Sequence, residues 1–377
     1  MPIKSKSGWS QGVRAAAAVA LTSALAVGCS ADAGEAEDLD PNIGTNVQAL
    51  SAQNIRVLTL NVRYDEPKST GLEGFSTRRS RINAVIRALN PDIIGLQEVE
   101  EHMWPAFRDD FPDYHGDYEA RGGPTNGDEG VGMLFRKRRF DRILEREVHT
   151  LTYEERMSCL TDDFARRDIL RAKVIDKVTN RTLDVFTTHW PSSDDCSKNR
   201  MARKVARWVE DFGDNVILMG DFNSGYTPCG GREGPYDLLL SKSSVPLSNA
   251  YKSVRGVAHN DPFITDKADE PEKRTGRMID HILFGPAYTV SDSDIDRSLF
   301  SGSTRVTCDD DTTDATANKQ SSCFNPYSFK SEFTINTRST CFVPYLNKSV
   351  SITSLKSYSD HWAVWADLKR VDCPNGC

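Results

Sequence analysis

The chain has 377 residues, of which 38% are hydrophobic and 27% are charged, a composition that excludes fibrous and fully disordered classes and allows a sizeable core. Its formal net charge of −7 argues against broad electrostatic binding of nucleic acid. A local basic groove or bound cations could still reverse that balance at one site.

The first 28 residues have the layout of a secretory signal peptide. Three basic residues precede an apolar run at 15–27, which is too short for a permanent membrane span. The sequence LAVGC, which ends at Cys29, is similar to a bacterial lipobox. We therefore expect removal of residues 1–28 and lipidation of Cys29, with a plainly secreted chain as the alternative. Either way the protein is predicted to be exported, to the outer membrane, the cell surface or the medium.

The segment at 30–50 carries five acidic and no basic residues and has no helical or strand period, which predicts a flexible tether. Loss of residues 1–28 removes three of the 47 basic residues and none of the 54 acidic ones, so the net charge changes from −7 to −10. Of the nine cysteines, eight remain if Cys29 carries lipid. In an exported chain they indicate up to four disulfides, whose pairing the sequence does not give.

From residue 55 onward, short apolar runs alternate with turn residues and amphipathic stretches. We expect core strands at 55–62, 92–99, 131–135, 183–189, 215–219, 279–284 and 362–368. Helical periodicity predicts two helices. Their apolar faces are Ile82, Val85, Ile86 and Leu89 in the first, and Met201, Val205, Trp208 and Phe212 in the second. Strands interspersed with helices over this length predict a layered α/β fold with helices outside sheets.

Residues 286–357 differ in character from the rest of the chain. They are dense in Ser, Thr and Asp, contain three Cys and show no helical period. We expect a disulfide-clipped insertion of strands and loops, with a partly disordered surface segment as the alternative. Its aromatic residues would pack this subdomain, or else insert into lipid or stack on bases. The main domain is placed at 51–372, followed by a Cys-containing tail at 373–377.

Polar side chains lie at or near the ends of the apolar runs. They are Asn61, Gln97, Glu98, His189, Asp221, Asn223, Asp280, His281, Asp360 and His361. Each alone is weak evidence, because a carboxylate at a strand end is often a cap and a lone His is often a packing residue. Together they supply what hydrolysis at phosphorus needs: oxygen ligands for a divalent cation, a base for water, and donors for the phosphoryl oxygens.

Six motifs carry a resemblance to a known family. In chain order they are LTLNVRYD at 58–65, DIIGLQEVE at 92–100, TTHWP at 187–191, GDFNS at 220–224, MIDHILF at 278–284 and SDHWAVWADL at 359–368. Together they resemble the endonuclease/exonuclease/phosphatase superfamily over roughly residues 55–370. The resemblance implies a four-layer α/β/β/α sandwich of two mixed sheets, the deoxyribonuclease-like fold, with the active site at one end of the sheets.

The resemblance also implies a metal site. Glu98 matches the family's metal carboxylate, and Asp360 is similar to a second carboxylate on the metal side. Asn61 matches an amide of the metal shell or one that contacts phosphate. The implied cofactor is Mg²⁺, with Mn²⁺ or Ca²⁺ as alternatives.

Five further positions match residues that handle water and phosphate. Asp221 matches the residue that orients or deprotonates the attacking water, and Asn223 the one that holds the scissile phosphate. His361 matches an imidazole on a phosphoryl oxygen, and Asp280 the carboxylate that orients and charges it. A carboxylate beside an imidazole favours its cationic form, which is the better donor. His189 matches a second His near the leaving group.

Arg167 precedes the strand that leads to TTHW, where nucleases often place an Arg on the substrate phosphate. An Arg of ordinary surface use is the alternative. Arg63 stands where apurinic endonucleases carry an acidic residue, and RMIDHILF at 277–284 replaces the form found in inositol phosphatases. Both departures lower the case for DNA repair and for inositol phosphates.

We therefore expect an exported, Mg²⁺-dependent phosphodiesterase, a monomeric and non-specific endonuclease that acts on extracellular nucleic acid and reaches the membrane through a lipid anchor. The same site fits a sphingomyelinase-like phospholipid phosphodiesterase or a phosphomonoesterase. A catalytically inactive, surface-anchored binding protein is a third hypothesis. It would lack one or more site residues, yet every one of them is present.

Overall fold

The computed structural model describes residues 54–65, 73–121, 129–150, 167–192, 195–225, 233–255, 278–296, 299–301, 304–306, 340–343, 348–351 and 358–371. All of them belong to one compact unit, Val47–Cys377. The predicted signal peptide, Cys29, the acidic tether and the tail at 373–377 lie outside the described residues. In the part of the chain that is described, no helix is long and apolar enough to cross a membrane.

One six-stranded sheet, the first sheet, has the strand order β11-β16-β1-β2-β4-β3. Its strands are β1 (Asn54–Asn61), β2 (Ile93–Val99), β3 (Tyr114–Ala120), β4 (Gly130–Arg136), β11 (Tyr288–Asp296) and β16 (Ala363–Arg370). β1 and β2 run parallel, whereas the other neighbours are antiparallel. The apolar runs predicted at 55–62, 92–99, 131–135 and 362–368 therefore form four central strands of this sheet.

A second six-stranded sheet, the second sheet, has the order β5-β6-β7-β8-β10-β9. Its strands are β5 (Glu145–Thr150), β6 (Asp168–Asp176), β7 (Arg181–His189), β8 (Val216–Asp221), β9 (Ser248–Asn249) and β10 (Asp280–Phe284). β7 and β8 run parallel, and the other neighbours are antiparallel. The sheet is mixed like the first, and it contains the other three predicted core strands.

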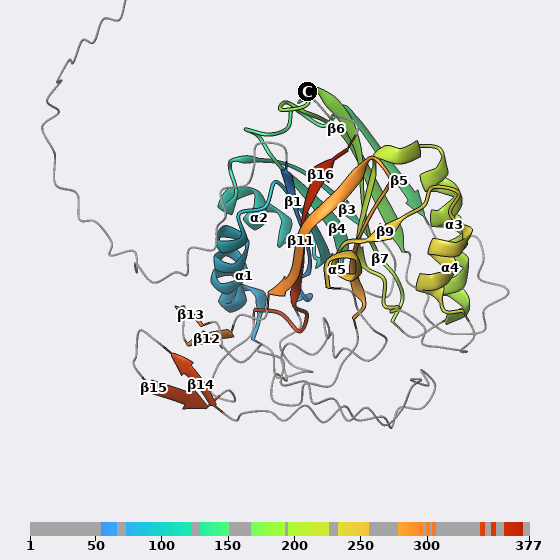
Figure 1. Ribbon diagram of the computed structural model, residues 1–377. Helices are drawn as coiled ribbons and strands as arrows, with labels where there is room; N and C mark the ends of the chain where they lie inside the picture. Colours follow the sequence, from blue (N-terminus) through green and yellow to red (C-terminus); the bar gives the residue numbers. More distant parts are fainter. Residues whose placement is uncertain are drawn as a thin grey trace, which may run out of the picture. The chain divides into compact units, whose positions relative to one another are not determined.

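Helices cover the outer faces of the two sheets. α1 (Phe75–Leu89) and α2 (Trp104–Asp110) lie on one side, and α3 (Asp195–Glu210) and α4 (Pro235–Lys242) on the other (Figure 1). Ile82 and Val85 of α1 share a core with both sheets, and Met201 of α3 packs with apolar residues of the second sheet. The expected four-layer sandwich and both expected helices are thus confirmed. α1 ends where predicted, with Asn90 as a left-handed cap at φ 48°.

The remaining described elements are short. α5 (Ala250–Arg255) and a single turn of 3₁₀ helix at Gly213–Asn215 belong to the loops around the second sheet. β12 (Leu299–Ser301) pairs with β13 (Thr304–Val306), and β14 (Thr340–Val343) pairs with β15 (Lys348–Ser351), all within the region predicted as an insertion. β11 lies in the same region yet pairs with β16 in the first sheet.

The facing layers are joined by a buried polar bridge. The side-chain amide of Gln97 on β2 accepts a hydrogen bond from Thr59 on β1 at 3.3 Å and donates one to Thr187 on β7 at 3.0 Å. All three side chains are fully buried. Because a buried polar group without its partner is costly, this bridge favours one alignment of the two sheets. Gln97 directly precedes Glu98 on β2, and Thr187 lies two residues before His189 on β7, so the bridge adjoins two of the predicted site residues.

Gly220 directly precedes Asp221 on β8, and its replacement tests whether the backbone there requires glycine. Its φ is +149°, and a Cβ there would lie 2.1 Å from the carbonyl oxygen of Thr188. We expect Gly220→Ala to lower the free energy of unfolding by about 3 kcal/mol or more, because both backbone strain and a backbone clash result. Gly213→Ala is the matched control, with φ +65° and nothing within 4 Å of its Cβ. It should cost about 1–2 kcal/mol in urea unfolding. Equal losses in the two variants would contradict the clash.

Candidate active site

The candidate site lies where the parallel strand pairs of the two sheets end. Asn61 ends β1 opposite Gln97 of β2, and His189 ends β7 opposite Asp221 of β8. Asp280 begins β10 opposite Asp221. The carboxyl ends of parallel strands lie at the same edge of a sheet, and in open α/β sheets ligands bind there. The stacked sheets therefore bring the polar motif residues into one volume.

The amide of Asn61 connects carboxylates that come from the two different sheets. Its Nδ2 donates to Glu98 Oε1 at 2.9 Å and to Asp221 Oδ2 at 3.1 Å. Its Oδ1 accepts the backbone N–H of Arg63 at 2.9 Å, which fixes the orientation of the amide. Asn61 is fully buried. This one side chain sets the separation of Glu98 and Asp221.

A bulge aims Glu98 into the site. The pairing of β2 with β4 shifts register between Gln97 and Val99, which leaves Glu98 out of the ladder. Its φ is 56°, and Asn223 has φ 45°. Non-glycine residues in this region of φ are strained, and such strain is concentrated at functional sites. The backbone N–H of Tyr64 donates to Glu98 Oε2 at 3.1 Å, so both carboxylate oxygens of Glu98 are held.

His361 is supported by Asp280 and faces Asp221. Its Nδ1 lies 2.9 Å from Asp280 Oδ2, and its Nε2 lies 3.8 Å from Asp221 Oδ2. Burial lowers the pKa of His361, but the charge and hydrogen bond of Asp280, helped by Asp221, outweigh burial and raise the pKa well above its usual value. His361 is therefore a cation at neutral pH, with its Nε2–H directed toward Asp221.

Asp221 is a carboxylate that titrates near neutrality. Burial and the negative charge of Asp280 raise its pKa to about 7, against the lowering effects of His361, the backbone N–H of Asn223 and the amide of Asn61. The Asn223 N–H donates to Asp221 Oδ1 at 2.7 Å, which leaves Oδ2 toward the site. A base works best when its pKa lies near the working pH. Asp221 meets that condition.

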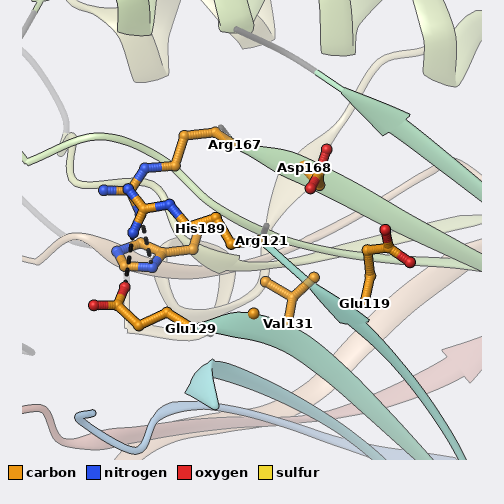
Figure 2. A pocket seen from close by; sticks show the side chains of 8 residues that line it. Glu119, Arg121, Glu129, Val131, Arg167, Asp168 and His189 are labelled. Carbon is orange, nitrogen blue, oxygen red and sulfur yellow. Dashed lines mark hydrogen bonds and ion pairs between the residues drawn. The ribbon is translucent and has the colours of Figure 1, made fainter. Parts of the chain in front are cut away.

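His189 is neutral, unlike His361. Burial and the charges of Arg167 and Arg121 lower its pKa well below the usual value. Arg167 Nη1 lies 3.1 Å from His189 Nδ1 (Figure 2). A guanidinium only donates, so Nδ1 is the acceptor and the ring proton sits on Nε2. That Nε2 lies 3.5 Å from Asp221 Oδ2 and 3.9 Å from Glu98 Oε1.

Donors converge on a single oxygen of Asp221. In addition to Asn61 at 3.1 Å, His189 at 3.5 Å and His361 at 3.8 Å, Nδ2 of Asn223 lies 3.4 Å from Asp221 Oδ2. Asn223 Nδ2 donates to the carbonyl oxygen of Trp190 at 2.8 Å and also lies 3.2 Å from His189 Nε2. A volume lined in this way stabilises a negatively charged oxygen.

Asp360 lies at the outer side of the same group and forms an ion pair. Its Oδ2 is 2.8 Å from Arg63 Nη1. The preceding Ser359 donates from Oγ to the carbonyl oxygen of Asn61 at 2.6 Å, which joins this loop to the end of β1. The sequence pointed to Asp360 as a metal ligand, and that role stays a prediction. Its contact with Arg63 was not anticipated.

The donor set fits a hard divalent cation on the Glu98 side. Glu98 and Asp360 offer carboxylate oxygens, which Mg²⁺, Mn²⁺ and Ca²⁺ prefer. Asn61 turns its Nδ2 toward Glu98 and its Oδ1 toward the backbone N–H of Arg63, so its role as a metal ligand stays a prediction. Asp221, Asp280 and His361 also have ligand atoms within 4.8 Å of one another. However, His361 is cationic and its Nδ1 is engaged by Asp280, whereas a His ligand must be neutral. We therefore favour the Glu98 side for a metal.

Two buried cations hold the loops of the site, and the sequence reasoning missed both. Arg78 of α1 donates to the carbonyl oxygens of Val62, Arg63, Tyr64 and Tyr358. Burial lowers its pKa to about 10. Lys198 of α3 donates to the carbonyl oxygen of Asn223 at 3.1 Å. The sequence signal that could have identified Arg78 is its place on the same helical face as Phe75 and Ile82.

Other polar candidates do not enter this group. His281 lies behind it, with Nε2 3.0 Å from the carbonyl oxygen of Ser224 and Nδ1 3.1 Å from Asn249, and burial lowers its pKa to about 4. It is a packing residue. Trp190 packs on Phe222 at 4.8 Å between centroids and is fully buried. Residues 122–128 of the Gly-rich loop lie outside the described residues.

The family model described as "Endonuclease/Exonuclease/phosphatase family" matches residues 58–303, which is more than half of the chain. The chain belongs to this family. The fold and the family together support hydrolysis of phosphoric esters as its general reaction. A comparison with curated protein sequences found no match.

Solved structures of the family share the fold. An endonuclease/exonuclease/phosphatase from Bacteroides vulgatus aligns with TM-score 0.58 and 21% identity over 84% of this chain and 99% of that one. A mannosyl-6-phosphatase from Bacteroides thetaiotaomicron gives 0.58 and 18% over 83% and 99%. TDP2 from D. rerio, complexed with a single-strand DNA product, gives 0.52 and 15% over 84% and 99%. At these identities the likeness establishes the fold alone.

Asp280 raises the pKa of both Asp221 and His361, so its replacement should move both limbs of the pH profile in a defined direction. In Asp280→Asn the pKa of Asp221 falls, because Asp280 raises it, and so does that of His361, for the same reason. The acidic limb of kcat/KM, near pH 7 from Asp221, should move to lower pH, and the basic limb from His361 should move the same way. Unmoved limbs would contradict this assignment. Asp294→Asn, a surface carboxylate paired with Arg255, is the control.

Proposed function

We propose that the chain is an exported, metal-dependent phosphoric ester hydrolase. The observation that carries the proposal is the convergence of neutral and cationic donors from Asn223, His189 and His361 beside a carboxylate whose pKa is about 7. Such a site favours a phosphoryl group, whose oxygens take the donors, with a base at hand for water.

The reaction follows from the charge states of the side chains. Asp221 takes a proton from water, and the water oxygen forms a bond to phosphorus while the bond to the leaving oxygen breaks in line. Asn223 and cationic His361 donate to the phosphoryl oxygens. Neutral His189 donates its Nε2–H in a hydrogen bond to the leaving oxygen, which takes its proton from solvent. A divalent cation held by Glu98 and Asp360 would supply Lewis-acid stabilisation of the phosphoryl charge.

Two substrate classes remain in view for this site. The sequence-based expectation is extracellular nucleic acid, and Arg167 beside His189 supports it as a phosphate contact. The pocket beside His189 carries three carboxylates, Glu119, Glu129 and Asp168, against the guanidinium groups of Arg121 and Arg167, and Arg121 is paired with Glu129. Its charge therefore does not oppose a nucleic-acid strand, and a phosphomonoester is the second substrate class for the same site. The phospholipid alternative has no comparable support among the described residues of this pocket.

Export and membrane attachment are part of the proposal and rest on the N-terminal sequence. The lipobox-like LAVGC, the acidic tether and the eight remaining cysteines support an exported lipoprotein. Cys196 at the start of α3 is disulfide-bonded, which agrees with an oxidising compartment. We propose that the enzyme acts as a monomer.

A substrate panel tests the proposed function. The chain from residue 30 onward, prepared oxidised with Mg²⁺, is assayed on plasmid DNA, RNA, sphingomyelin, a hexose phosphate and an aryl phosphodiester. We expect hydrolysis of at least one ester, abolished by EDTA and lowered about 10³-fold by His361→Ala, because the cationic donor is lost. His115→Ala, on β3, serves as the His control. Undiminished turnover of His361→Ala would sink the assignment.

A further inference from the structure

The side of the site that would hold a metal contains a guanidinium group as well as carboxylates. Arg63 follows Asn61 by two residues, and its Nη1 lies 2.8 Å from Oδ2 of Asp360. The two side chains are 16% and 19% exposed, so solvent screens this ion pair only in part. Asp360 is one of the two carboxylates predicted to bind a divalent cation. One of its oxygens therefore has a cationic partner before any metal binds.

Both the backbone and the side chain of Arg63 are fixed in this position. Its N–H donates to Asn61 Oδ1 at 2.9 Å, its carbonyl oxygen accepts from Arg78 at 2.9 Å, and its φ is 61°. A left-handed backbone is costly for a non-glycine residue and persists only where surrounding contacts hold it. The ion pair with Asp360 is thus built into the loop after β1, unlike a chance contact of a long surface side chain.

The charges of four groups on this side cancel before a metal binds. Glu98 and Asp360 carry two negative charges, which the guanidinium groups of Arg63 and Arg78 balance. Burial lowers the pKa of Arg78 to about 10, which still leaves it a cation at neutral pH, and the charges of Asp360 and Glu98 oppose this lowering. A divalent cation added to these four groups gives an excess of positive charge. Metal binding is therefore easier when Arg63 moves away from Asp360.

Arg63 has a second partner that does not compete with a metal. Its guanidinium lies 4.2 Å from the centre of the Tyr64 ring, and its Nη2 donates to the Tyr64 hydroxyl at 3.1 Å. A guanidinium over an aromatic face is stabilised without any carboxylate. Asp360, by contrast, follows Ser359, whose Oγ is bonded to the carbonyl oxygen of Asn61 at 2.6 Å. The long side chain of Arg63 can therefore leave while the carboxylate stays in place.

We propose that Arg63 competes with the divalent cation for Asp360: the guanidinium holds the carboxylate in the metal-free enzyme, and metal binding exchanges it for the cation. The proposal rests on the metal dependence proposed above. Asp360 then has a partner of opposite charge in both states, so the loop that carries His361 is never left with an unpaired, largely buried carboxylate. Because only the fraction of molecules with a released Asp360 binds metal fully, the exchange lowers the apparent metal affinity. Arg63 is thus the residue that sets this affinity.

A double-mutant cycle on Mn²⁺ binding tests the exchange. The Kd is measured by electron paramagnetic resonance of free Mn²⁺, with the oxidised chain from residue 30 onward and no ester present. We expect Arg63→Met to tighten binding about tenfold, because Asp360 is released while the length of side chain 63 is kept. In an Asp360→Asn background the same change should tighten binding only about twofold, because only general repulsion between the two cations remains.

Three further variants separate charge from structure. Arg63→Gln also removes the charge and should tighten Mn²⁺ binding like Arg63→Met, so it replaces that variant if thermal unfolding shows that methionine disturbs the fold. Arg63→Lys keeps a cation beside Asp360 and should bind Mn²⁺ within about threefold of the wild type. Arg79→Met is the matched control. It removes another arginine–aspartate pair, with Asp110 at 2.6 Å on the surface of α1 and α2, and should leave the Kd unchanged.

The outcomes separate the exchange from the proposed function. Equal tightening by Arg63→Met in both backgrounds, no tightening at all, or equal tightening by Arg63→Lys would overturn the exchange, whatever the enzyme hydrolyses. A tenfold effect that needs Asp360, in a chain that hydrolyses no ester, would uphold the exchange and overturn phosphoric ester hydrolysis. Lack of Mn²⁺ binding by the wild type and every variant, together with hydrolysis that persists in EDTA, would overturn the metal dependence and the exchange with it.

Discussion

The side-chain amide of Asn61 is the contact on which the site depends. It ends β1 of the first sheet and donates both to Glu98 of that sheet and to Asp221 of the second. A fully buried amide with both donors and its acceptor engaged has one orientation, so the two carboxylates cannot move apart without leaving a polar group unpaired. The layers of the sandwich act as a frame that brings this amide and the two carboxylates within hydrogen-bond distance.

The charges around that contact give the two histidines of the site different protonation states. Asp280 makes His361 a cation, and burial together with Asp280 raises the pKa of Asp221 to about 7, so an acid form and a base form coexist at neutral pH. Burial together with the charge of Arg167 lowers the pKa of His189 and keeps it neutral, with its proton on the side of the reaction. Residues of one type thus differ in role because a carboxylate supports one ring and a guanidinium the other.

The sequence predicted the central strands well, because their apolar runs are buried on both faces, as in 55–62 and 215–219. It did not predict five other strands of the two sheets, which are β3, β5, β6, β9 and β11. β5 is mostly exposed and charged, whereas in buried β6 the charged residues Arg171 and Lys173 interrupt the apolar run. The site residues were predicted from the order of the motifs. Their protonation states were predicted only in part. The Arg63–Asp360 pair joins residues 297 positions apart and the Arg167–His189 contact crosses two strands, so both depend on a geometry that local patterns do not encode.

The account is tested most directly by turnover of Asn61→Leu at saturating Mg²⁺, on whichever ester the wild type cleaves fastest. Leucine keeps the volume of the side chain but removes the donor that Glu98 and Asp221 share. We predict that turnover falls about 100-fold or more while the chain stays folded by near-UV circular dichroism, because the preorganised separation of the two carboxylates is lost. Turnover within about twofold of wild type would contradict the central role of this amide.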